Sequence, residues 1–187
     1  MFRYVAVLLL TLATFITPAF AAVPSWKINP QKSRLSWMVY YNHQTIKGDF
    51  IKLDGDIHFD PDQLEKSNFT ITIDLDSVLA QSSKMEKALK GPYFFNIAHF
   101  PKAVYKSGKI TATSQGYVAH GTFSLAGVTK PLALPFKVVI LDNHEASAEG
   151  HFSLSRHAFN VGHGPADQHG IGDRVNIVFT LDAIRED

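Results

Sequence analysis

Histidine and aspartate side chains that could bind a metal ion gather between residues 162 and 173. His163 and His169 lie in this segment with aspartates beside them, and imidazole groups are common ligands of zinc and copper. Their spacing matches no rigid ligand template, and the glycine-rich sequence around them is typical of a flexible rim loop. We therefore predict no metal site and keep a metal-dependent hydrolase that uses both histidines as an alternative.

No side chain has the context of a catalytic group. Ser124 lies in Gly121–Gly127, which superficially resembles a nucleophile elbow, but the serine is misplaced for GxSxG and falls within an expected strand. The chain has no cysteine, which excludes thiol catalysis, thiolate metal sites and covalent haem attachment. We predict no catalytic residue, no cofactor and no enzyme activity; a serine hydrolase is a further alternative.

Arg156 is the charged residue that we include among the predicted ligand contacts. It follows an apolar stretch, where its guanidinium group would meet the polar head of a ligand. A structural ion pair with an acidic neighbour such as Asp173 or Asp182 is the competing interpretation. The sequence leaves both open.

The elements that must position these residues are almost all strands. Apolar and polar side chains alternate with a period of two from Arg34 to Ala183, as in half-buried antiparallel strands. Ser83–Lys90 is the expected helix, because Ser83 and Glu86 form a capping box and Gly91 with Pro92 ends it. We predict an all-β fold, an eight-stranded antiparallel barrel with this one short inserted helix.

Two irregularities interrupt the pattern. Apolar residues change parity between Phe50 and Leu53, and we favour a β-bulge near Ile51–Lys52 over a hairpin at Asp54–Gly55. Pro131 and Pro135 have no amide hydrogen, so the strand from Val128 to Val139 is expected to be an edge or a distorted member of the barrel.

Large aromatic residues recur on the apolar rows of neighbouring strands. They fill the barrel or line a hollow interior, and the sequence weighs these outcomes about equally. We predict that the ligand-binding residues are Trp37, Val39, Phe50, Phe69, Ile71, Phe94, Phe95, Phe123, Phe136, Phe152, Phe159, Phe179 and Arg156.

Residues 1–21 are expected to be a cleavable signal peptide. Arg3 precedes an apolar run from Val5 to Ile16, and Ala19-Phe20-Ala21 is a small-x-small cleavage signature. Residues 22–187 then form one domain, either free in the periplasm or secreted. Without Arg3 the basic residues equal the 17 acidic ones, a balance that gives no grip on nucleic acid or an anionic membrane surface.

Several segments, in this order and spacing, resemble the YceI family of exported, lipocalin-like proteins over Ser25 to Arg185. They are Trp26–Ser33, Gly48–Phe50, Gly55–Pro61, Tyr93–Asn96 with Phe100-Pro101, Gly121–Lys130 and Arg156–Phe159. One departure is the helix before the aromatic loop. The family usually has an arginine and a histidine there, and this chain has Met85–Lys90, so their roles are not carried over.

The resemblance implies an eight-stranded lipocalin-like barrel that acts as a periplasmic carrier. Its ligand would be an amphiphilic lipid, namely an isoprenoid quinone, a polyisoprenoid or a fatty-acyl compound. It also implies a homodimer and, in some relatives, an association with b-type membrane cytochromes. The alternative function is therefore an accessory protein that presents quinone to such a cytochrome. A barrel about 25 Å tall would make a chain beyond about 20 extended carbons bend or protrude.

Overall fold

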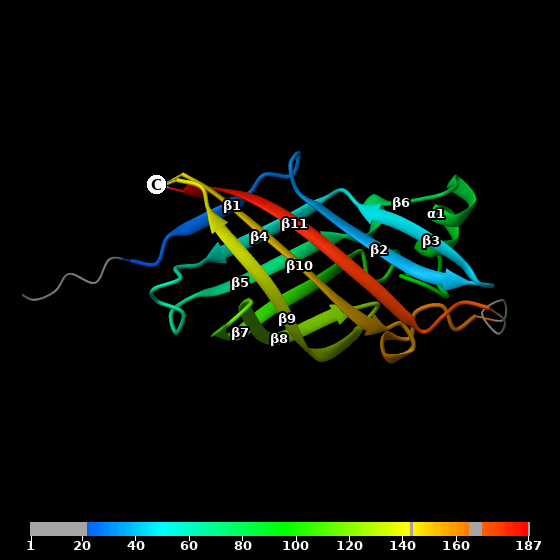
Figure 1. Ribbon diagram of the computed structural model, residues 1–187. Helices are drawn as coiled ribbons and strands as arrows, with labels where there is room; N and C mark the ends of the chain where they lie inside the picture. The colour runs from blue at the N-terminus through cyan, green and yellow to red at the C-terminus, as the bar shows by residue number, and fades with distance from the viewer. Residues whose placement is uncertain (1–21, 143, 165–169, 187) are drawn as a thin grey trace, which may run out of the picture.

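The computed structural model describes residues 22–142, 144–164 and 170–186 (Figure 1). Eleven strand segments form one sheet. They are β1 (Ser25–Ile28), β2 (Arg34–Tyr41), β3 (Gln44–Phe50), β4 (Leu53–His58), β5 (Asn68–Asp74), β6 (Val78–Ala80), β7 (Lys102–Thr113), β8 (Gly116–Leu125), β9 (Val128–Ile140), β10 (Glu145–Ser155) and β11 (Arg174–Glu186). The helical elements are η1 (Leu75–Ser77), α1 (Ser83–Lys90) and η2 (His157–Phe159).

The sheet closes into the predicted barrel. Three pairs of consecutive segments, β1 with β2, β3 with β4 and β5 with β6, are each one long strand with a short break. Counted in this way, the described residues form eight antiparallel strands. Closure comes from β11, which pairs with β10 on one side and with both β1 and β2 on the other. The predicted eight-stranded antiparallel barrel is confirmed.

The chain bends at Ile51 and Lys52, where the sequence predicts a bulge. β3 pairs with β2 and β6, whereas β4 pairs with β1 and β5. Two hydrogen bonds join this bend to the end of β5 and to η1, from Lys52 N–H to Ser77 Oγ at 3.1 Å and from Asp74 N–H to the Lys52 carbonyl at 3.0 Å. The alternative hairpin at Asp54–Gly55 is wrong, because both residues lie inside β4 and pair with β5.

The wall of the barrel is open between β9 and β10. β9 pairs with β8 from Val128 to Phe136 but with β10 only from Lys137 to Ile140. Beyond this point the two strands diverge (Figure 1). Pro131 and Pro135 lie in the divergent part of β9, where a proline has no amide hydrogen to donate to a neighbouring strand. The predicted distortion of this strand is confirmed, and η2 contacts both β9 and β10.

The helix α1 has the predicted range and a cap one residue earlier than predicted. Ser82 is the N-cap, and its Oγ accepts a hydrogen bond from Met85 N–H at 3.3 Å. Glu86 instead accepts a hydrogen bond from Ala80 N–H at 3.1 Å, which attaches the helix to β6. No residue of α1 is buried. In the described part of the chain, no helix has the length and apolar character needed to cross a bilayer.

The two ends of the barrel differ. One end, which we call the α1 end, carries α1, residues 91–100 and η2, and the other, the β1 end, carries β1 (Figure 1). The alternating rows of the strands place the buried side chains between these two ends.

Candidate ligand-binding cavity

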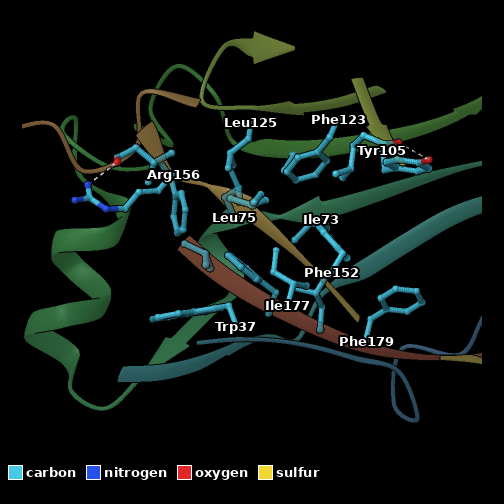
Figure 2. A pocket seen from close by; sticks show the side chains of 18 of the residues that line it. Trp37, Ile73, Leu75, Tyr105, Phe123, Leu125, Phe152, Arg156, Ile177 and Phe179 are labelled. Carbon is cyan, nitrogen blue, oxygen red and sulfur yellow. Dashed lines mark hydrogen bonds between the residues drawn. The ribbon is translucent and has the colours of Figure 1, made fainter. Parts of the chain in front are cut away.

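A cavity of about 150 Å³ occupies the half of the barrel that faces the α1 end. Figure 2 shows Arg156 beside α1 and Phe179 towards the other end of this cavity. Ten of the thirteen predicted ligand-binding residues line it: Trp37, Val39, Phe50, Ile71, Phe94, Phe95, Phe123, Phe152, Arg156 and Phe179. We call this cavity the first chamber.

A second chamber of about 80 Å³ lies towards the β1 end. The predicted residues Phe69 and Phe136 line this chamber and not the first. Their rings are 5.7 Å apart at the centroids, and the Phe136 ring also packs at 5.9 Å from Phe59. The Trp26 Nε1–H donates a hydrogen bond of 3.0 Å to the Phe59 carbonyl. The second chamber is therefore lined in part by aromatic side chains that pack against one another.

Four side chains line both chambers and form the neck between them: Ile71, Leu134, Phe179 and Leu181. The interior is therefore neither a solid core nor one continuous tube. A dry apolar cavity of about 150 Å³ can hold a molecule of about the size of benzene. Without movement of side chains, the first chamber has room for about six carbon atoms, so barrel height alone does not set the room for a ligand.

Phe159 is the predicted site residue that the structure places outside both chambers. Phe159 is not one of the described residues that line either chamber. Its side chain is buried in η2, and its ring packs edge-on against Phe123 with a centroid distance of 5.5 Å. It supports the wall and does not form its surface, because η2 follows the end of β10 and leaves the inward row of that strand.

Arg156 holds the chain at the α1 end. The side chain is only 4% exposed, and its guanidinium donates hydrogen bonds to four backbone carbonyls. Nε bonds Gly172 at 3.0 Å, Nη2 bonds Ile171 at 3.0 Å, and Nη1 bonds Val161 at 3.0 Å and Gly162 at 2.6 Å. The side chain thereby connects the end of β10 to both ends of the 161–172 segment while it lines the first chamber.

The predicted ion-pair partners of Arg156 have different positions. Asp182 as a partner is wrong, because it pairs with Ser147 near the far end of β10 and β11. The carboxylate of Asp173 accepts hydrogen bonds from His157 N–H at 3.0 Å and Ser155 Oγ at 2.8 Å. The bond from the His157 backbone is the main cause of a lowered Asp173 pKa, and the positive charge of Arg156 contributes a smaller part.

Tyr105 and Trp37 place two polar groups in the wall of the first chamber that the alternation of the sequence does not predict as polar contacts. Burial raises the pKa of Tyr105 to about 12, and its hydroxyl lies 2.8 Å from the Ala119 carbonyl and 3.2 Å from that of Leu132. The Trp37 Nε1–H is buried, and within the described residues it has no hydrogen-bond acceptor.

Aliphatic residues form much of the wall, whereas most of the residues predicted from the sequence are aromatic. The aliphatic residues that were not predicted lie on inward-facing rows of the strands. The period-two alternation of the sequence therefore already indicated that they face the interior. They include Leu35, Leu53, Ile73, Leu75, Leu125, Leu132, Leu134, Leu154, Val175, Ile177 and Leu181.

Ser124 and His163, two of the residues considered for catalysis, line neither chamber. Ser124 is on the outward row of β8, where its hydroxyl is 2.7 Å from Thr129 Oγ1 on β9. The exposed ring of His163 is hydrogen-bonded to the Asn160 carbonyl, and His169 lies outside the described residues. In the portion of the chain that the structure describes, no three His, Asp or Glu side chains group as a metal site would require.

Solved structures with the same architecture include Burkholderia cenocepacia BcnA, with a TM-score of 0.76 and 25% identity over 83% of this chain and 98% of that one. A polyisoprenoid binding domain from Saccharophagus degradans has a TM-score of 0.72 and 16% identity, over 89% of this chain and all of the other. Both likenesses cover more than four fifths of this chain.

The sequence comparisons cover the same region. A UPF0312 protein of Yersinia pestis is 25% identical over 183 residues, which is 92% of this chain and 93% of the relative. The model of the YceI-like domain matches residues 26–183, from the tryptophan that anchors the second chamber to the last inward row of β11. The chain therefore belongs to the YceI-like domain family.

Proposed function

We propose that this chain is a periplasmic carrier that binds one amphiphilic lipid chain inside its barrel and performs no bond chemistry. The ligand is an isoprenoid quinone, a polyisoprenoid or a fatty-acyl compound. The observation that carries the proposal is the first chamber, which is walled by apolar side chains and has the buried cation of Arg156 at the α1 end. Likeness to the Saccharophagus degradans domain, which is described as polyisoprenoid binding, supports the same class of ligand.

Burial of the lipid chain supplies the driving force. Each buried methylene contributes about 0.8 kcal/mol, so the six carbons that fit the first chamber contribute about 5 kcal/mol. Association and ordering cost about 4–15 kcal/mol. A useful affinity therefore requires further carbons in contact with protein. Leu89, Phe94 and Phe95 supply apolar contacts towards the α1 end.

Native mass spectrometry followed by organic extraction tests the proposal. Protein purified from the periplasm of a Gram-negative host is expected to carry a lipid that dissociates on denaturation, and the same spectrum reports whether the predicted homodimer forms. Co-purification with a haem protein would favour the alternative role of presenting quinone to a b-type cytochrome. Protein that carries no lipid and takes up none from added fatty acids or isoprenoid quinone contradicts the carrier role.

A matched pair of variants on β11 shows whether the lipid is inside the barrel. Val175 lines the first chamber, whereas Val178 is on the outer face of the same strand and is 53% exposed. Val175→Trp fills the chamber and should lower lipid occupancy about tenfold, in line with the cost of overpacking. Val178→Trp adds the same ring outside and should leave occupancy unchanged. Equal effects of both changes would place the lipid elsewhere.

A further inference from the structure

The neck between the chambers brings side chains together from three strands. Ile71 comes from β5, Leu134 from β9, and Phe179 and Leu181 from β11. Phe179 is the largest of the four, and its side chain is 6% exposed. A lipid chain that enters from the α1 end reaches this group of side chains after it has filled the first chamber.

The position of the Phe179 ring depends on a glycine in the neighbouring strand. Gly150 pairs with Phe179 across β10 and β11, and a Cβ atom added at Gly150 would lie 2.5 Å from Cζ of Phe179 and 2.5 Å from the Pro135 carbonyl oxygen. The ring therefore occupies the space that a side chain at position 150 would fill. It lies close to the point where the β9–β10 ladder ends, at Lys137 and Glu149.

We propose that Phe179 is the residue that sets the length of lipid chain accepted by this protein. This inference rests on the proposed lipid-binding function and names the part of the wall that gives it specificity. A chain that ends at the neck binds without moving the ring. A longer chain must displace the ring or leave carbons in water. Either outcome removes the binding free energy that each added methylene would otherwise contribute.

The second chamber sets the size of the expected change. If about 150 Å³ holds about six carbons, about 80 Å³ holds about three more. In Phe179→Ala the two chambers join, and the accepted chain should lengthen by about three carbons or more. Each added methylene within this range should raise affinity about fourfold, the equivalent of about 0.8 kcal/mol.

Calorimetric titration of delipidated protein with a homologous series of straight-chain fatty acids tests the inference. In the wild type, the gain in binding affinity for each added carbon should stop at one chain length, which we call the limit. Phe179→Ala should move this limit to longer chains. Phe69→Ala is the control, because Phe69 lines the second chamber only, beyond the Phe179 ring. It enlarges the space behind the ring and should leave the limit unmoved while the ring is in place.

The outcomes separate this inference from the proposed function. Phe179→Leu, a milder change, should move the limit by a smaller amount and serves if the alanine variant does not fold. An unmoved limit in a folded Phe179 variant, or the same movement in Phe69→Ala, overturns the role of Phe179 and leaves lipid binding in place. Failure of the wild type to bind either fatty acids of any length or isoprenoid quinone overturns both.

Discussion

At the scale of single residues, the two tryptophans of the barrel differ in what their indole N–H groups bond. Trp26 donates to the Phe59 carbonyl, whereas the Trp37 N–H has no acceptor among the described residues. Trp26→Phe leaves a buried carbonyl without its donor and should cost about 1–3 kcal/mol more than Trp37→Phe. Urea unfolding of the two variants measures the difference, and equal losses would show that the hydrogen bond of Trp26 contributes little.

Tyr105 should make the barrel sensitive to alkali. Its pKa is raised to about 12 by burial, so the folded protein holds this proton more tightly than the unfolded chain, whose tyrosine titrates near pH 10. The resulting stability is complete below pH 10 and is lost as the pH rises towards 12. Thermal unfolding across this range should show a steeper decline in wild type than in Tyr105→Phe. Parallel declines would mean that the phenol ionises normally.

At the scale of elements, Arg156 connects β10 and η2 to the segment that leads into β11. Arg156→Gln removes a cation bonded to four backbone carbonyls. The free energy of unfolding should fall by about 3 kcal/mol, because hydrogen bonds from a charged donor are stronger than those from a neutral one. Arg174→Gln, an exposed change at the start of β11, should stay within about 0.5 kcal/mol. Urea unfolding compares them, and limited proteolysis should cut residues 161–172 of the Arg156 variant first.

The helix α1 is suited to act as a lid on the first chamber. None of its residues is buried, its Leu89 lines the chamber, and it is held by the Glu86–Ala80 hydrogen bond and a 2.8 Å ion pair between Lys90 and Asp76. An element with few buried contacts opens at low cost. Replacing Ser83–Lys90 with a glycine-serine linker should change the dissociation rate of a fluorescent fatty acid more than the free energy of unfolding. A large loss of stability without a rate change would argue against a lid.

At the scale of the whole molecule, the barrel is closed by β1, which fills the gap between β11 and β4 beyond the end of β2. Residues 1–21, the predicted signal peptide, lie outside the described residues. We predict that the exported protein begins at Ala22, and intact mass of the periplasmic fraction measures this. Ala19→Arg should block cleavage, because the site requires small residues. A periplasmic mass that includes residues 1–21 would contradict the prediction.

The sequence alone determined the local features of this protein. Period-two alternation specified the strands and the rows that point inward, since successive side chains of a strand face opposite sides. The change of parity after Phe50 marked the bend, Pro131 and Pro135 marked the divergent strand, and Gly91 marked the end of α1. Each of these signals depends on residues within one turn or one strand, so each is readable without knowledge of the fold.

The tertiary structure decided which residues meet. The β10–β11 register separates Asp182 from Arg156, and Phe159 leaves the cavity because η2 ends the inward row. The neck exists because side chains from β5, β9 and β11 meet inside the closed barrel. Alternation says that a side chain points inward and not how far along the axis it lies. That height depends on strand tilt and register, which closure of the whole sheet determines.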